Sequence, residues 1–163
     1  MRYVIPILGA GLFAVAAYGD VRTRRIPNAL AIAVTALGLV RLILAGDPGE
    51  ALDSFAAAAA IFAAGFLLFW RGLFGGGDVK LMAAAVLLVG YHALPGFLVV
   101  MGLCGLFVTL AVLAAGKLMP RPAAAVLGAE THNQTPARVT VPYAVPIAAS
   151  GILTLILQSP ISW

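Results

Sequence analysis

Two aspartates, Asp20 and Asp78, stand at the ends of long apolar stretches of the sequence. Acidic side chains are costly next to a bilayer and usually serve a function there. When two carboxyl groups lie close together they cannot both ionise cheaply, so one keeps a proton while the other stays anionic. The anion can draw a proton from water, and the neutral acid can polarise an amide carbonyl. The pair therefore indicates a diaspartyl hydrolytic site, provided that the fold brings the two residues together.

The residues around each aspartate suit the start of a helix. Downstream of Asp20, Ile26-Pro27-Asn28 places a proline where a first helical turn tolerates it. Before Asp78, Gly75-Gly76-Gly77 permits unusual backbone angles and close approach of another chain. Asp78 alone also suits an N-cap, and Asp20 alone suits a loop acid paired with a neighbouring arginine. From the residues alone, these structural roles stay open beside the catalytic one.

The composition is that of a protein built into a membrane. Of the 163 residues, 63% are apolar and 10% are charged, whereas soluble domains have about half and about a quarter. Ten basic and six acidic side chains cannot cover a soluble fold of this size. The same numbers exclude a disordered chain, a fibrous repeat and a coiled coil. The single cysteine, Cys104, excludes an internal disulfide. We expect an all-α, polytopic membrane protein.

A membrane span needs about twenty mostly apolar residues, which predicts about six transmembrane helices in a single transmembrane domain, residues 1–163. The predicted spans are residues 3–18, 28–45, 52–70, 79–91, 95–116 and 139–157. The fourth is short for a full crossing. Residues 117–138, rich in proline, alanine and polar residues, are predicted to form a cytoplasmic loop within the domain.

Basic residues predict the orientation, because cytoplasmic loops carry most of them. With the first helix starting outside, eight of the ten lie on the cytoplasmic side: Arg22, Arg24, Arg25, Arg71, Lys80, Lys117, Arg121 and Arg138. Arg2 and Arg41 lie outside. Two crossings separate Asp20 from Asp78, so both must lie on one side, and this rule makes it the cytoplasm. The net charge of +4 then reflects topology, and no nucleic-acid partner is expected.

Together these motifs resemble the type IV prepilin peptidases, a family of intramembrane aspartic proteases. Its members pair an aspartate upstream of an Ile/Leu-Pro-Asn/Asp turn with a second aspartate in a Gly-x-Gly-Asp motif. The matching residues here are Asp20 before Pro27 and Asn28, and Gly75, Gly77 and Asp78 followed by Lys80. Val141-Pro142-Tyr143 before the last helix is also similar, although Ala144 stands where the family pattern has glycine. The resemblance covers nearly the whole chain.

The resemblance implies catalysis by Asp20 and Asp78, with Pro27, Asn28, Gly75, Gly77, Lys80, Pro142 and Tyr143 as supporting motif residues. The small size is similar to the single-domain branch that serves tight-adherence (Flp-type) pili. The implied substrate is a prepilin with a basic leader and an apolar helix, cleaved at the cytoplasmic face of a bacterial inner membrane. The cysteine-containing insert of larger members is not seen, so we expect peptidase activity without methyl transfer. Lys80 itself has the position of an interface anchor.

Two other classes of function stay open. A membrane transporter would place ionisable groups near the bilayer midplane, whereas the acids here stand at helix ends. A pilus-assembly scaffold, or a catalytically silent relative that only binds prepilin, would tolerate loss of both aspartates. No metal or cofactor is expected, because Glu130 and His132 lack further ligands nearby. The sequence does not indicate an oligomeric state.

Overall fold

The structure is a computed structural model that describes residues 4–23, 27–118 and 144–158. Within these residues the chain forms helices and short connections, and no strand. The helices are α1 (Val4–Thr23), α2 (Asn28–Ala45), α3 (Pro48–Trp70), α4 (Gly76–Val89), the short 3₁₀ helix η1 (Tyr91–Ala93), α5 (Leu94–Leu118) and α6 (Ala144–Gln158). The all-α prediction is confirmed.

Four segments of the described chain are long and apolar enough to cross a membrane: Val4–Arg22, Asn28–Ala45, Pro48–Trp70 and Tyr91–Ala111. The helix α6 is apolar but shorter. The helix α4 has 14 residues and is about 21 Å long, less than the hydrocarbon thickness of about 30 Å. The protein is therefore a multi-pass membrane protein, and the helix in the predicted span 79–91 is short, as the sequence indicated.

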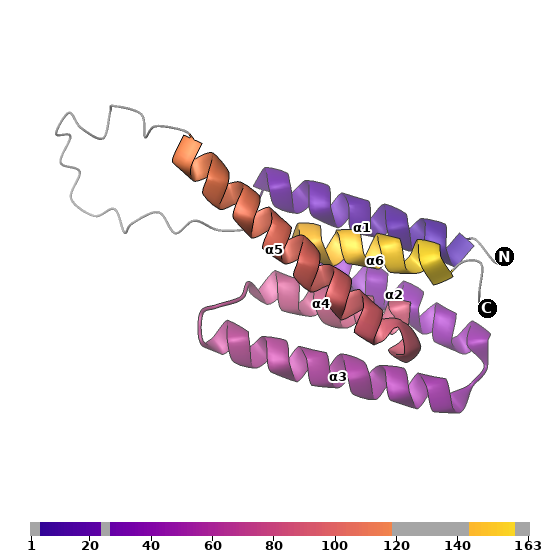
Figure 1. Cartoon of the computed structure of the whole chain (residues 1–163). Helices are drawn as coiled ribbons and strands as arrows, with labels where there is room; N and C mark the ends of the chain where they lie inside the picture. Colours follow the sequence, from indigo (N-terminus) through magenta and orange to yellow (C-terminus); the bar gives the residue numbers. More distant parts are fainter. Residues whose placement is uncertain (1–3, 24–26, 119–143, 159–163) are drawn as a thin grey trace.

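The short helix α4 is held inside the bundle. Nine of its residues are buried, and it packs against α2, α3 and α6. Figure 1 shows α1 and α6 side by side, with α5 crossing the bundle obliquely. Because its neighbours shield α4 from lipid, it does not need to reach both membrane surfaces. Its N-terminal end sets the depth of Asp78.

A glycine permits the close contact between α2 and α4. A Cβ atom added at Gly38 would lie 3.0 Å from the carbonyl carbon of Leu87 and from the backbone nitrogen of Leu88. A larger residue would press on the α4 backbone, which cannot yield as a flexible side chain does. Gly38 therefore fixes α2 at a short distance from α4.

A buried ion pair joins α2 and α3. Arg41, near the end of α2, pairs with Glu50 in the first turn of α3, and their side chains are only 8% and 19% exposed. Gly90, at the end of α4, makes room for the guanidinium, since an added Cβ would lie 2.8 Å from either terminal nitrogen. Its φ of 87° also suits glycine. Arg41 is therefore part of the packed structure, at the end of the bundle opposite to the aspartates.

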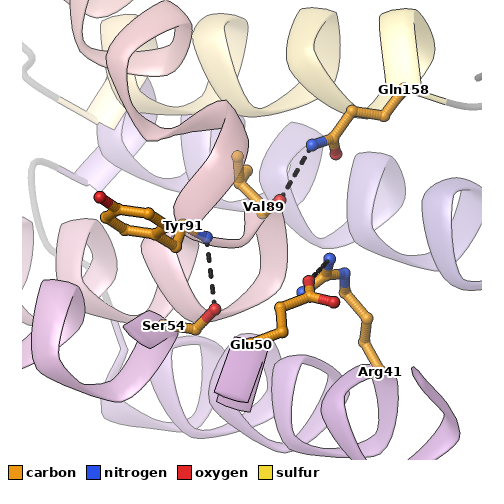
Figure 2. A network of polar contacts seen from close by, with 6 residues as sticks. All are labelled: Arg41, Glu50, Ser54, Val89, Tyr91 and Gln158. Carbon is orange, nitrogen blue, oxygen red and sulfur yellow. Dashed lines mark hydrogen bonds and ion pairs between the residues drawn. The ribbon is translucent and has the colours of Figure 1, made fainter. Parts of the chain in front are cut away.

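Two further hydrogen bonds fasten the C-terminal end of α4 to its neighbours (Figure 2). The Tyr91 backbone N–H donates to Oγ of Ser54 on α3 at 3.3 Å. The Gln158 side-chain amide on α6 donates to the Val89 carbonyl at 3.0 Å. Helix C-termini leave carbonyls without intrahelical partners, and Gln158 satisfies one of them. We call this end of the bundle, with Arg41 and Glu50, the arginine end.

The opposite end of the bundle carries both aspartates, and we call it the aspartate end. The chain reverses direction from α1 to α2, from α2 to α3 and from α3 to α4 (Figure 1). The last turn of α1 therefore lies at the same end as the starts of α2, α4 and α6. Asp20 belongs to that last turn, and Asp78 belongs to the first turn of α4.

Glu50→Gln is expected to destabilise the fold, because it removes the negative charge that faces the buried Arg41 guanidinium. Breaking a buried pair from one side costs about 3 kcal/mol or more. The measurement is the free energy of unfolding of the full chain in lipid–detergent bicelles. Asp53→Asn, an exposed acid on the same helix, is the matched control and should leave that free energy unchanged. Equal stability of Glu50→Gln and the wild type would contradict the prediction.

Candidate functional site

Asp20 is held by the start of a helix far away in sequence. It is buried, with 7% of the residue exposed, and its Oδ2 accepts a hydrogen bond from the Ala144 backbone N–H at 3.1 Å. Ala144 is the first residue of α6, where backbone N–H groups have no partner within the helix and the helix dipole is positive. The start of α6 therefore orients the Asp20 carboxylate.

Asp78 folds back on the start of its own helix. It is partly buried in the first turn of α4 and accepts a hydrogen bond from the Gly75 backbone. Gly75, the N-cap residue, has no side chain to contribute, and a Cβ added there would lie 2.7 Å from the Asp78 Oδ2. Asp78 is thus not the N-cap itself, but it meets the N-cap backbone much as the acid of a capping box does. The absence of a side chain at Gly75 makes room for the carboxylate.

The two carboxyl groups interact electrostatically. Burial, and then the negative charge of Asp20, raise the pKa of Asp78 to about 6, while the hydrogen bond from Gly75 opposes the rise. Asp78 precedes the apolar part of a helix that is too short to span the membrane. The structure therefore brings together the two aspartates that the sequence selected, from α1 and from α4. Such a pair can divide the roles of proton acceptor and proton donor.

A second contact links the two motifs that surround the aspartates. The Lys80 ammonium donates a hydrogen bond to Oδ1 of Asn28 at 3.2 Å, and both residues are exposed. Lys80 was predicted as an interface anchor, and the structure gives it this additional partner at the start of α2. Pro27 is the N-cap of α2, and its carbonyl accepts from the Leu30 N–H. The proline thus comes one residue before the helix instead of inside its first turn.

Of the other predicted motif residues, the structure describes Gly77 but not Pro142 or Tyr143. Gly77 lies in the first turn of α4, next to Asp78. Pro142 and Tyr143 lie outside the described residues, as does most of the predicted loop 117–138, of which the first residue, Lys117, belongs to α5. Within residues 4–23, 27–118 and 144–158, no group of three or more His, Cys, Asp or Glu residues could hold a metal ion.

Sequence reasoning missed the backbone partners of the two carboxylates. Ala144 acts through its N–H, so its residue type gives no signal. The position at which the last helix begins was the available clue, because free N–H groups gather there. Gly75 was included as a glycine that permits close approach, and the group that approaches it is the Asp78 side chain.

The fold and the paired carboxyl groups define a multi-pass membrane protein with a candidate hydrolytic centre at one end of its bundle. A model of the type IV leader peptidase family matches residues 7–110, which is more than half of the chain and includes both aspartates. The chain therefore belongs to the type IV leader peptidase family, and it is a protease of the leader-peptidase kind. The match ends before residues 141–143. Neither a curated protein nor a solved structure matches the chain.

The raised pKa of Asp78 predicts how stability changes with pH. Between its ordinary value of 3.8 and about 6, the folded protein binds more protons than the unfolded chain, so the contribution of Asp78 to stability is lost as the pH rises through this window. Asp78→Asn should remove this fall in stability with rising pH. Asp20→Asn should make the fall smaller, because it removes the negative charge that helps to raise the pKa of Asp78. Unfolding free energies measured from pH 4 to pH 7 test this. The control Asp53→Asn should show the same pH dependence as the wild type. The same result for Asp78→Asn would contradict the prediction.

Proposed function

We propose that this protein is an aspartic endopeptidase of the Gly-x-Gly-Asp type that removes the leader from type IV, Flp-type prepilins. The observation that carries the proposal is the electrostatic interaction by which the Asp20 charge raises the pKa of Asp78, in a chain of the type IV leader peptidase family. These residues share no helix, and a structural role of either alone does not require the other nearby. Two interacting carboxyl groups at a membrane surface match the needs of peptide hydrolysis.

The reaction uses the two carboxyl groups in different protonation states. The ionised member of the pair accepts a proton from a water molecule, and the water oxygen attacks the carbonyl carbon of the scissile peptide bond. The protonated member polarises the carbonyl oxygen. The Ala144 N–H orients Asp20, and the raised pKa of Asp78 favours a pair that holds one proton. The tetrahedral intermediate then breaks its C–N bond as the leaving amine takes up the proton that the carboxylate received from the water. Because the two groups are coupled, they titrate as a pair.

The proposed substrate has a short basic leader followed by an apolar membrane helix. Peptide bonds inside such a helix are hydrogen-bonded internally and shielded from water, so they resist hydrolysis. A site at the end of the bundle meets the substrate where its helix frays. Of the glycines before Asp78, Gly75 is exposed and Gly76 and Gly77 are partly buried. Because they carry no side chains, an extended peptide can approach the carboxylate there.

The aspartate end faces the cytoplasm in this proposal, in the inner membrane of a bacterium. Of the described basic residues, Arg22, Arg71 and Lys80 stand in the end turns at the aspartate end, and Arg41 is at the arginine end. The fifth, Lys117, is in the last turn of α5, which runs back from the arginine end (Figure 1). Basic residues favour the cytoplasmic side. The proposed activity is cleavage alone, without N-methylation of the product.

Replacing either aspartate is expected to abolish cleavage. Asp20→Asn and Asp78→Asn each remove a carboxyl group that moves a proton, and such groups contribute about 100-fold or more to rate. The measurement is the fraction of a Flp-type prepilin that is shortened when the purified protein and substrate share a liposome. Asp53→Asn at the arginine end is the control and should cleave normally.

The same variants separate the enzyme from the alternatives. A loss of cleavage reports on catalysis only if the variant still inserts into the membrane and unfolds cooperatively, as the wild type does. A pilus-assembly scaffold or a transporter would keep its function in both aspartate variants. Normal processing by either variant would show that the assigned pair is wrong.

Gly75→Ala tests the placement of the Asp78 carboxylate. The added methyl group would lie 2.7 Å from its Oδ2, so the carboxylate must rotate away, which a side-chain tip can do without disturbing the fold. Misplacing a catalytic group by about 1 Å can lower a rate by up to about 100-fold. We expect at least about tenfold slower cleavage at unchanged thermal stability. Gly11→Ala is the matched control, because its added methyl group has no neighbour within 4 Å; equal rates for both variants would contradict the prediction.

A further inference from the structure

An apolar groove runs between α2, α3 and α4, on a side of α4 that the candidate site does not use. Its volume is about 560 Å³, within the usual range of small-molecule sites. The side chains that line it are Asn28, Ala31, Ile32, Thr35, Ala36, Leu39, Ala58, Phe62, Lys80, Ala83, Ala84 and Leu87. The many alanines in this wall leave the space that larger side chains would fill.

The polar groups of the groove gather at its mouth. Asn28 and Lys80 stand at the aspartate end, joined by their hydrogen bond of 3.2 Å. That bond uses one of the three N–H donors of the ammonium group. Farther along, the hydroxyl of Thr35 donates to the Ala31 carbonyl of its own helix at 2.8 Å, so it adds no free polar group to the wall. The groove therefore has a cationic mouth and an apolar interior.

The length of the groove matches one leaflet of a bilayer. From Asn28 to Leu39 the α2 wall is about 16 Å long at about 1.5 Å per residue, and half of the hydrocarbon core is about 15 Å thick. Because Lys80 stands at the end of the bundle, the mouth lies at the level of the lipid headgroups. The interior then reaches to the middle of the membrane.

We propose that this groove binds one anionic glycerophospholipid, with an acyl chain along α2 and α4 and the phosphate on the Lys80 ammonium. The charge of Lys80 complements the phosphate, and Asn28 fixes the position of the ammonium group. Basic side chains at the membrane surface attract anionic lipids. The site requires a membrane around the protein, which its apolar helices establish, and it does not depend on the proposed peptidase mechanism.

The apolar helix of a substrate is a poorer occupant of this groove. Lys80 and Asp78 are two residues apart on α4, so their side chains leave the helix on opposite sides. Asp78 interacts with Asp20 of α1, whereas Lys80 contacts Asn28 of α2. A substrate helix in the groove would place its scissile bond on the wrong side of α4. A lipid needs only the cationic mouth and the apolar wall.

The test measures which lipids stay bound to the full chain. The protein is reconstituted in nanodiscs of equal parts phosphatidylglycerol and phosphatidylethanolamine, released into the gas phase, and its retained lipids are weighed by native mass spectrometry. Lys80→Gln should lower retained phosphatidylglycerol about fivefold, because one basic residue near the surface contributes about 1 kcal/mol. Arg71→Gln, which removes an exposed cation at the same end but outside the groove, should retain as much as the wild type.

A second pair of variants tests the interior of the groove. Ala36 is exposed to the groove and Ala56 is exposed outside it. Ala36→Phe should reduce the retention of both lipids at unchanged thermal stability, and Ala56→Phe should not. Equal retention in Lys80→Gln, Ala36→Phe and the wild type would overturn the proposal. So would a photo-crosslinker at position 36 that captures an added prepilin in place of phosphatidylglycerol.

Discussion

The electrostatic cost of holding two carboxyl groups close together governs the aspartate end of this protein. Burial and the charge of Asp20 both disfavour the ionised form of Asp78. Two helix starts offset part of this cost, because each supplies backbone donors that no intrahelical acceptor uses. The start of α6 serves Asp20 through Ala144, and the start of α4 serves Asp78 through Gly75. The site is therefore built from helix ends, and it needs α4 to begin beside the last turn of α1.

The arginine end supplies the rigidity that such a site requires. Groups that act on a substrate must be held by elements that are themselves fixed in place. The buried pair of Arg41 and Glu50 ties α2 to α3, and the bonds from Ser54 and Gln158 hold the far end of α4 (Figure 2). With that end fastened, the glycines at the other end can leave backbone exposed without loosening the bundle.

Much of this architecture could be read from the sequence, because apolar stretches between turn residues determine where membrane helices lie. The bounds 28–45 were predicted as observed, since Pro27 and Gly46 end that stretch clearly. The count of basic residues assigned Arg41 to the outer side of the membrane, but such a count does not show what the residue contacts. Its burial depends on Glu50 and on the space at Gly90, and a linear pattern does not show such tertiary partners.

For the candidate site, too, the sequence predicted the position of the key residues but not their tertiary partners. The number of crossings was enough to place Asp20 and Asp78 on one side of the membrane. Their partners were not predictable in this way, since Ala144 contributes only its backbone and Gly75 contributes only the absence of a side chain. Residue types report side-chain chemistry, so contributions of the backbone become visible only in the fold.

The helix α4 separates the candidate catalytic site from the proposed lipid groove. One side of its first two turns bears Asp78, which interacts with Asp20 of α1, and the other bears Lys80, which contacts Asn28 of α2 at the groove. A ligand in the groove and a peptide at the aspartates would therefore occupy different sides of one helix and would not exclude each other sterically.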